Sequence, residues 1–440
     1  MKITFKYFFK YVFIILISLW IGSFIGNKFP NLPGFNIFSN DDPSKINSIF
    51  DKDFSLVNIS TQKILKQKKL IEVKRKANNI ILLIADGMGI GHISTYRLLR
   101  GGPNERVALD LFPVSGFVLT HSSNAIITDS AASATAYSTG KKTNNGVLGL
   151  DKNYEFIENF TEKIQKYGFL NSLISTSDIT HATPAAFVTH VESRSNTDEI
   201  SKQIIESDIA TVLGGGRHFF LPQELGGKRK DKINLLEQAR LSHVLLTEKN
   251  ELKNFSFKGQ DKVIGLFADK HLRDLENTEN HESEPSLKEM LNFAIKRSLQ
   301  INKDSCKGFF IMAEGSQIDW AGHANNLNYL EREMHDFEEA VQLAFDYAKE
   351  DQNTLVIVTA DHETGGLLIE PESLNDYLTS KVKFSFNTGI GYGSHTGSPV
   401  PIYAYGPGSE NFTGTLDNTD VFYAMLEALN LENEDESCLE

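Results

Sequence analysis

Short apolar runs alternate with longer amphipathic stretches along most of the chain. The runs are NIILLIADG, FLNSLIST, IATVLGG, HVLLT, KVIGLFA, KGFFIMAEG and NTLVIVTADHE, and each has apolar residues on both faces of the strand rather than on one. Strands that are buried on both faces, as in parallel sheets, have this pattern. The stretches PSLKEMLNFAIKRSLQ and LEREMHDFEEAVQLAFDYAKE have helical periodicity. The alternation predicts an α/β protein in which helices cover both faces of a mostly parallel sheet, a three-layer α/β/α sandwich.

The beginning of the chain has a different character. Three lysines within the first ten residues precede an uncharged stretch from residue 11 to residue 27. A positive segment followed by an apolar one is typical of a secretory signal peptide or an N-terminal membrane anchor, and we assign this role to residues 1–26. Both alternatives stay open, because no cleavage site is clear and the stretch is short for a span of about 17 to 25 residues. Either one predicts an exported protein, periplasmic or anchored to the outer face of the cytoplasmic membrane.

Composition and charge suggest the remaining divisions. Residues 27–76 are rich in Asn, Pro, Ser and Lys and end in STQKILKQKKLIEVKRK, which predicts a linker and a polar helical arm. The main domain is expected over residues 77–431, and an acidic tail over residues 432–440. Lys+Arg 44 against Asp+Glu 57 gives a formal net charge of -13, which argues against nucleic acid as a specific partner. The two cysteines, Cys306 and Cys438, cannot form a disulfide framework.

Polar side chains follow several of the apolar runs. These residues are Asp86, Glu314, Asp361, His362 and, beyond FLNSLIST, His181 and Thr183. In a parallel sheet, ligands bind beyond the carboxyl ends of the strands, so we expect these side chains to lie close together. Any one of them alone is more often a helix cap or a turn residue. Their repetition after four runs favours a binding or catalytic site.

The same residue types are those that hold metal ions. Asp319 and His323 are four residues apart in SQIDWAGHANN and share one face if the segment is helical. That spacing is a weak signal alone, but together with Asp361–His362 and with His395 in GSHTGSP it suits two zinc ions. A harder ion such as magnesium suits an oxygen-only set, which consists of Asp86, Thr183 and Glu314.

A serine stands where a helix is predicted to begin. The segment ITDSAASATAYSTGKKTNNG contains Asp129–Ser130 and continues in small residues that favour a helix. Such a serine is most often an N-cap. A helix N-terminus also attracts anions, however, and a serine beside a metal ion is a candidate nucleophile. Arg194, in HATPAAFVTHVESRS, has a planar guanidinium that can hold two oxygens of a tetrahedral oxyanion.

These segments together resemble the alkaline phosphatases. ADGMG, TDSAASATAYSTG, HATPAAFVTHVESR, LGGGR, AEGSQIDWAGH, TADHETGG and GSHTG occur in the order of that family, and the resemblance covers about residues 79–431. It implies that the main domain hydrolyses phosphate monoesters to an alcohol and inorganic phosphate. Ser130 then corresponds to the phosphorylated nucleophile and Arg194 to the phosphate clamp, with Asp129 orienting Arg194.

The resemblance also divides the metal ligands among three sites. One zinc site comprises Asp319, His323 and His395, the second comprises Asp86, Asp361 and His362, and the magnesium site comprises Asp86, Thr183 and Glu314. In the family mechanism the serine attacks phosphorus in line and forms a phosphoserine, which water then hydrolyses while the zinc ions assist both steps.

The chain departs from the enterobacterial type at two positions. That type has Asp in place of His181 and Lys in place of Trp320. The pair implies an altered metal preference at the third site and an altered phosphate affinity, with neutral drift as the alternative. The stretch from His362 to His395 is short, so we expect a reduced crown insertion over about residues 366–392. The family also implies a homodimer.

Three other functions fit the residues less well. Sulfatases need a modified residue in a CxPxR setting, and neither DSCKG nor ESCLE provides one. Phosphodiesterases share the two-zinc ligands but generally lack this serine in combination with Arg194, Thr183 and Glu314. A non-catalytic exported metal or phosphate binder has no need of Ser130. We therefore expect a metal-dependent phosphomonoesterase of broad range that acts on small-molecule esters and scavenges phosphate.

Overall fold

The computed structural model describes residues 68–257, 262–275, 283–302, 307–372, 381–429 and 431. The predicted export segment, most of the linker and arm, the acidic tail and both cysteines lie outside these residues. Within the described part of the chain, no helix is long and apolar enough to span a bilayer.

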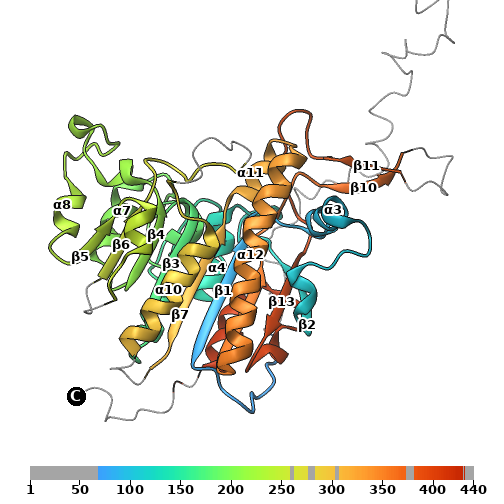
Figure 1. The fold of residues 1–440 in the computed structure, drawn as a ribbon, viewed down its shortest axis with the longest axis horizontal. Coiled ribbons are helices and arrows are strands. Elements are labelled where there is room, and N and C mark those ends of the chain that lie inside the picture. The colour runs from blue at the N-terminus through green and yellow to red at the C-terminus, as the bar shows by residue number, and fades with distance from the viewer. Residues whose placement is uncertain are drawn as a thin grey trace, which may run out of the picture. The chain divides into compact units, whose positions relative to one another are not determined.

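A ten-stranded sheet forms the centre of the fold (Figure 1). From one edge to the other its strands are β14 (Gly414–Asp417), β2 (Val114–Leu119), β13 (Val400–Tyr405), β8 (Thr354–Thr359), β1 (Asn79–Ala85), β7 (Phe309–Gly315), β3 (Leu170–Asp178), β4 (Thr211–Gly215), β6 (Lys262–Leu266) and β5 (His243–Leu246). Only β13 runs antiparallel to its neighbours β2 and β8; every other pairing is parallel. The mostly parallel sheet predicted from the sequence is therefore confirmed.

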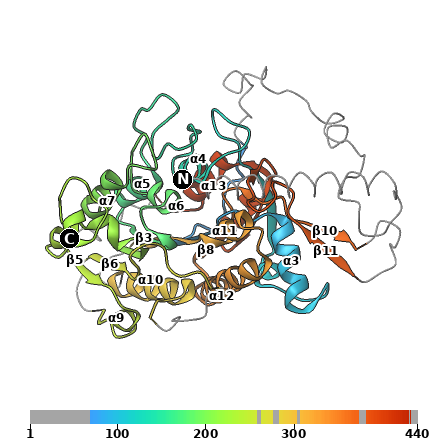
Figure 2. The same ribbon diagram turned by 90° about the horizontal axis from the view of Figure 1, so that it is seen from above.

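Helices cover both faces of this sheet, as Figure 2 shows. One face carries α3 (Ile90–Gly101), α9 (Lys249–Lys253), α10 (Leu287–Asn302) and α12 (Leu327–Asp351). The opposite face carries α4 (Ser130–Thr139), α5 (Phe160–Gln165), α6 (Ala182–Ala185), α7 (Thr197–Glu206) and α13 (Asn418–Ala428). The described residues thus form the predicted α/β/α sandwich. Its core consists of side chains from the central strands, which are buried on both faces of the sheet; in β1, for example, all seven residues are buried.

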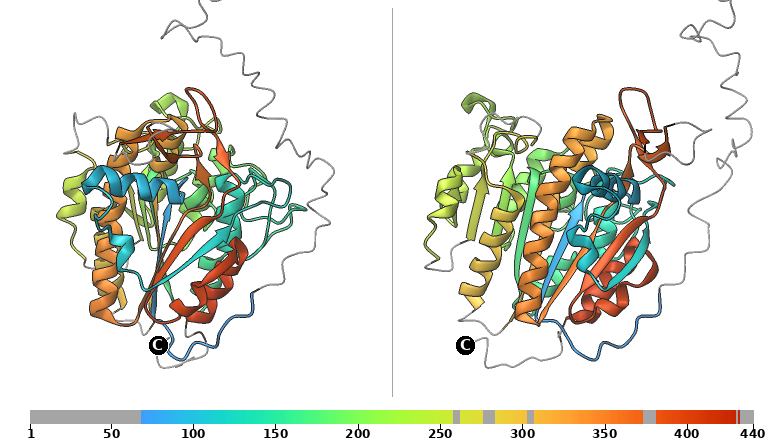
Figure 3. Two further views of the ribbon diagram at one scale, coloured as in Figure 1. Left: turned by 90° about the vertical axis from the view of Figure 1, so that its right-hand side faces the viewer. Right: turned by 45° about the vertical axis from the view of Figure 1, so that its right-hand side comes forward.

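Shorter elements complete the fold. They are α8 (Leu235–Ala239), α11 (Gln317–His323), β9 (Glu363–Thr364), β12 (His395–Thr396), β10 (Leu368–Pro371), β11 (Val382–Ser385) and the 3-10 turns Ala108–Leu111, Arg217–Phe220, Gln223–Leu225 and Ser409–Phe412. Strands β10 and β11 pair antiparallel within the region predicted as a reduced crown. Figure 3 shows this hairpin toward the end of the sheet where α11 lies.

One local prediction is wrong. Residues 68–76, expected to end a helical arm, form no helix. Instead the backbone N–H of Ile71 donates to the buried side chain of Asn411 at 2.7 Å, and the Asn411 amide donates back to the Ile71 carbonyl at 3.0 Å. The N–H of Lys68 donates to Asp420 at 3.2 Å. These side chains satisfy backbone groups that a helix would have paired internally.

Candidate active site and metal centre

The predicted site residues gather at the carboxyl ends of four neighbouring strands, β8, β1, β7 and β3. Asp86 directly follows β1, and Glu314 lies in β7 opposite Ile84 of β1. Asp361 follows β8 within two residues, and Thr183 lies in α6, just beyond β3. Parallel pairing in register brings these ends to one edge of the sheet, as expected for an α/β ligand site.

Gly87 permits a close approach at this edge. Its φ is +77°, a conformation that L side chains rarely adopt, and a Cβ there would lie 2.6 Å from the Cα of Asp319. Any larger residue would therefore push α11 away from β1. The glycine of the ADGMG segment brings Asp319 next to Asp86.

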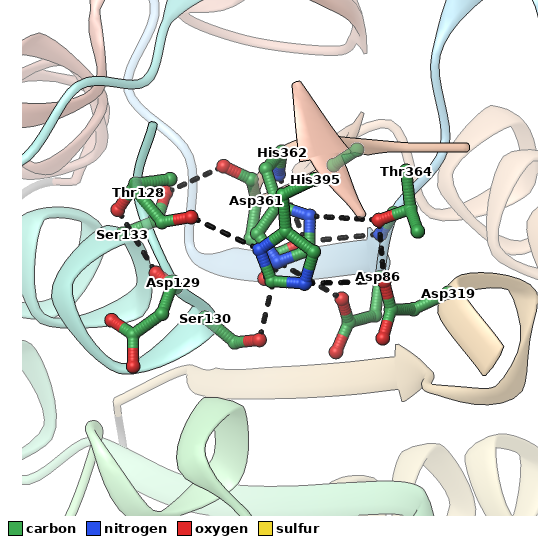
Figure 4. Close-up of polar contacts among 12 residues, drawn as sticks. Asp86, Thr128, Asp129, Ser130, Ser133, Asp319, Asp361, His362, Thr364 and His395 are labelled. Atoms are coloured by element: carbon green, nitrogen blue, oxygen red, sulfur yellow. Dashed lines mark hydrogen bonds and ion pairs between the residues drawn. The ribbon is translucent and has the colours of Figure 1, made fainter. Parts of the chain in front are cut away.

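Ser130 is the first residue of α4 and is 3% exposed. Asp129 caps this helix by accepting a hydrogen bond from the N–H of Ala132 at 3.0 Å. Every residue of α4 is buried, so the start of the helix is held in place by packing. The Ser130 hydroxyl lies 3.3 Å from Nε2 of His362 (Figure 4). The N-cap role expected for Ser130 belongs to Asp129, which leaves the serine hydroxyl for another partner.

The second carboxylate oxygen of Asp129 holds Arg194. It accepts hydrogen bonds from the N–H of Gly146 at 3.0 Å and from Nη1 of Arg194 at 3.1 Å. The other terminal nitrogen of Arg194 lies 3.2 Å from Nε2 of His181. Asp129 thus contacts both the helix that begins at Ser130 and the guanidinium expected to bind phosphate.

The first group of metal-ligating side chains consists of Asp319, His323 and His395. Nε2 of His323 lies 3.3 Å from Asp319 and 3.2 Å from Nε2 of His395. Each imidazole uses its other nitrogen as a donor: Nδ1 of His323 to the carbonyl of Gly393 at 2.8 Å, and Nδ1 of His395 to that of Thr128 at 3.0 Å. These outer contacts orient both Nε2 lone pairs toward Asp319, the arrangement typical of metal-binding histidines.

The second group consists of Asp86, Asp319 and His362, and Asp361, predicted as its third member, lies beside His362. Nε2 of His362 lies 3.6 Å from Asp86 and 3.2 Å from Oδ2 of Asp361. The other oxygen of Asp361 accepts the backbone N–H groups of Gly87 at 3.1 Å and His362 at 2.9 Å. Asp361 is therefore fixed with one oxygen facing His362, and Asp319 lies between the first two groups.

The third group brings together Asp86 and Glu314, both predicted as ligands of one site, and His181, predicted beside it. Thr183, expected as a ligand, is fully buried, and its hydroxyl has no hydrogen-bond partner. Ser175 donates a hydrogen bond of 2.6 Å to one oxygen of Glu314 and leaves the other oxygen free.

Unsatisfied buried atoms indicate that these groups suit cations. Among the described residues, buried atoms without a hydrogen-bond partner include both oxygens of Asp86, Oδ2 of Asp361, Oε1 of Glu314, Oγ1 of Thr183 and Nδ1 of His181. A buried polar atom without a partner costs about 1 to 3 kcal/mol, so a cluster of them needs compensation. Oxygen and imidazole nitrogen donors are the ligands that zinc and magnesium take in proteins.

The pKa values of the site's side chains also indicate that these groups suit cations. Burial, followed by the charge of Asp361, raises the pKa of Asp86 well above its usual range. Burial also raises the pKa of Glu314 to about 7. Burial lowers the pKa of His362, so its ring is neutral at pH 7 and retains a lone pair. Cations held by these side chains would reverse the local field and keep the carboxylates ionised.

Two further residues contribute to the site although they were not predicted as site residues. The hydroxyl of Thr364 donates to Asp319 and lies 3.2 Å from Nδ1 of His362, so it connects the first two groups. Thr364 lies two residues beyond His362 in TADHETGG, within the motif that resembles the family. Ser175 ends the run FLNSLIST. Both could have been suspected as polar residues at the carboxyl end of a predicted strand.

A fold of this kind with such a site defines a metal-dependent hydrolase of the α/β class. A model of the family "Alkaline phosphatase" matches residues 77–381 and 370–431. The chain belongs to the alkaline phosphatase family, and its activity is the hydrolysis of phosphate monoesters.

Known relatives agree with this assignment. Alkaline phosphatase 3 of Bacillus subtilis is 34% identical over 438 residues, which cover 81% of this chain and 91% of the relative. The solved alkaline phosphatase of the Antarctic bacterium TAB5 is 34% identical and has a TM-score of 0.72, with coverage of 82% of this chain and 100% of that one. A histidine-to-aspartate variant of the same enzyme, with magnesium in its M3 site, is 33% identical with a TM-score of 0.69 and covers 80% and 98%.

Proposed function

We propose that this alkaline phosphatase acts through a phosphoserine formed on Ser130. The observation that carries the proposal is the position of the Ser130 hydroxyl, 3.3 Å from His362 at the start of a buried helix. In the first step the Ser130 oxygen forms a bond to phosphorus and the ester oxygen leaves as the alcohol. In the second step water breaks the bond between Ser130 and phosphorus, which regenerates the serine and releases inorganic phosphate.

The protein's own groups bind the phosphoryl group. Arg194 uses one terminal nitrogen to contact Asp129, and its planar guanidinium presents further N–H donors toward the side of the site where His181 lies. The dipole at the N-terminus of α4 attracts negative charge at the same point. Burial of Ser130 and His362 limits the access of bulk water and strengthens these interactions.

We assign the metal ions by donor type. Zinc suits Asp319, His323 and His395, and a second zinc suits Asp86, Asp361 and His362. The oxygen donors of Asp86, Thr183 and Glu314 alone would suit magnesium, a preference that the adjacent His181 changes. When bound, such ions supply Lewis-acid charge that offsets the phosphate and lowers the pKa of hydroxyl groups.

His181 is proposed to alter the third site. Its Nδ1 is buried without a partner, and the ring lies within ligating distance of Asp86 and Glu314. An imidazole there shifts the donor set from oxygen toward nitrogen, which favours zinc over magnesium. The TAB5 relative offers a parallel, since its histidine-to-aspartate variant binds magnesium in the M3 site.

We further propose that the enzyme acts outside the cytoplasmic membrane as a homodimer and scavenges phosphate. Export is supported by the lysine-rich start and the uncharged stretch that follows it. The dimer is supported by family membership.

Hydrolysis of a chromogenic phosphate monoester by the full chain at pH 7 to 10 tests the proposal. Activity should disappear on chelation and return when zinc and magnesium are added. Ser130→Ala should abolish turnover while retaining zinc and the binding of inorganic phosphate. A folded, zinc-loaded wild type without turnover would contradict the proposal, and so would a fully active Ser130→Ala variant.

A further inference from the structure

His271 lies beside the site although no motif includes it. It follows β6 on a segment that crosses the carboxyl edge of the sheet. Its ring centroid is 4.4 Å from that of Trp320, with an interplanar angle of 64°. It is also 6.1 Å from the ring of His181, at 89°. Trp320 and His181 themselves meet at 6.0 Å and 85°. Three segments distant in sequence thus place three rings in mutual edge-to-face contact, a favourable aromatic geometry.

The position of His271 is fixed by Asp178, at the end of β3. Nδ1 of His271 lies 3.0 Å from Oδ2 of Asp178 and 3.1 Å from the backbone nitrogen of the same residue. The other oxygen of Asp178 accepts a hydrogen bond from Thr180, and the carboxylate is buried. Burial tends to raise the pKa of Asp178, but the hydrogen bond with His271 and the nearby imidazoles hold it below its usual range. The carboxylate that anchors His271 is therefore charged.

Trp320 connects this pair to the phosphate side of the site. It directly follows Asp319 in α11, and unlike Asp319 it is only partly buried. Its ring contacts His181, whose Nε2 lies 3.2 Å from the Arg194 guanidinium. A change in the orientation of the indole therefore reaches the phosphate-binding arginine through one intervening ring. The Ser130 hydroxyl instead contacts His362, which comes from β8 rather than from these segments.

We propose that His271, held by Asp178, is a positioning residue that fixes the Trp320 indole and thereby sets the affinity of the site for phosphate. The proposal rests on the phosphate-binding role assigned above to Arg194. Because the contact acts on binding rather than on the Ser130 nucleophile, its loss changes KM and phosphate inhibition more than kcat. Breaking one aromatic pair corresponds to about a three- to tenfold change in affinity.

The experiment compares the wild-type holoenzyme with His271→Ala, His271→Phe and Asp178→Asn. His271→Phe keeps a ring against Trp320 but loses the contact with Asp178. His335→Ala is the matched control, since His335 is on the outer helix α12 with a side chain 53% exposed. Steady-state hydrolysis of a chromogenic monoester gives kcat and KM, and inorganic phosphate serves as the competitive inhibitor.

Trp320 provides a second readout that a general loss of stability would not move. The chain has two tryptophans, so a Trp20→Phe background leaves Trp320 as the single indole fluorophore. Its emission is recorded in the folded holoenzyme while inorganic phosphate is titrated. Circular dichroism checks that each variant is folded. If His271→Ala does not fold, His271→Phe still tests the proposal.

His271→Ala should raise the phosphate inhibition constant about three- to tenfold with little change in kcat, and should shift the Trp320 emission. His271→Phe should recover part of both effects, and Asp178→Asn should add little once His271 is alanine. Unchanged phosphate inhibition and emission in His271→Ala would overturn the proposal, as would a loss confined to kcat. If the wild type did not hydrolyse monoesters, the proposed function would fail, but the fluorescence titration would still test the positioning role.

Discussion

The hydroxyl of Ser130 lies 3.3 Å from Nε2 of His362, although 232 residues separate them in sequence. The contact exists because β8 delivers His362 to the carboxyl edge of the sheet while α4 begins beside that edge. It places a serine next to a side chain of the second metal-ligating group.

Arg194→Lys should weaken phosphate binding. Lysine is a point charge and cannot reproduce the planar fork with which Arg194 contacts Asp129 and approaches His181. The loss of about one charge-assisted hydrogen bond should raise KM and the phosphate inhibition constant roughly 10- to 100-fold, with a smaller effect on kcat. Steady-state kinetics with added inorganic phosphate measures both constants.

Arg106→Lys is the matched control, because the Arg106 side chain is 86% exposed and contacts only Asp110 among the ion pairs described. Equal behaviour of Arg194→Lys and Arg106→Lys would exclude Arg194 from phosphate binding.

Removal of metal should destabilise the fold as well as abolish activity. Without a cation, the carboxylates of Asp86 and Glu314 are buried with atoms that lack partners. By mass action, metal present at about 1,000 times its dissociation constant adds about 4 kcal/mol to the free energy of unfolding. Scanning calorimetry of the chelated protein, before and after addition of zinc and magnesium, should show a rise in the melting temperature.

Asp86→Ala should show a smaller rise in that experiment, since Asp86 belongs to two of the metal-ligating groups. An identical melting temperature with and without metal in the wild type would count against metal sites at this edge.

His181→Asp should change which metal the third group holds. The substitution replaces a nitrogen donor beside Asp86 and Glu314 with oxygen donors, which magnesium prefers. The ratio of magnesium to zinc, measured by elemental analysis after equilibration with both metals, should rise. His335→Asp on the outer helix is the control, and a ratio that rose equally in both variants would show that the added charge, not the site, was responsible.

Glu333 should make the stability of the fold depend on pH. Burial raises the pKa of this α12 side chain to about 8, and its Oε1 accepts the N–H of Leu275 at 2.9 Å. Since the pKa of Glu333 in the folded state lies above that in the unfolded state, the protonated side chain contributes to the free energy of unfolding. This contribution is fully present below about pH 4.5 and is lost as the pH rises through about 8. Its loss should lower the free energy of unfolding by on the order of a few kcal/mol.

Glu333→Gln mimics the protonated side chain and should flatten this dependence between pH 5 and pH 9, as measured by urea unfolding. Glu331→Gln, on the same helix, is the control. A wild type and a Glu333→Gln variant with the same pH profile would contradict the assignment.

Much of this structure could be predicted from the sequence. Each of the seven runs that have apolar residues on both faces forms a strand of the parallel sheet, because burial on both faces leaves a strong local signal. Strands β2, β13 and β14 lack this local sequence signal. β2 alternates between half-buried and exposed positions over most of its length, and β14 is only four residues long with two of them exposed. Their pairing depends on contacts distant in sequence.

The site also contains residues that could be predicted from the sequence and residues that could not. Residues in motifs at the strand ends, such as Asp86 and His362, were predictable because parallel strands end at one edge. The direct approach of His181 to Glu314 was not, since only the folded chain shows these two side chains within ligating distance of each other. The role of His271 could not be predicted either, because it lies beyond β6 on a segment without a motif. That role depends on Asp178 and Trp320, which are distant in sequence but in contact with it.

The most direct test of the account is to look for phosphate on Ser130. The full-length enzyme, loaded with zinc and magnesium, is mixed with a phosphate monoester and quenched in acid, and its peptides are analysed by mass spectrometry. We predict that the peptide containing Ser130 gains the mass of one phosphoryl group and that the Ser130→Ala variant gains none. Turnover without any phosphorylated Ser130 peptide, or with phosphate on a different residue, would contradict the phosphoserine mechanism.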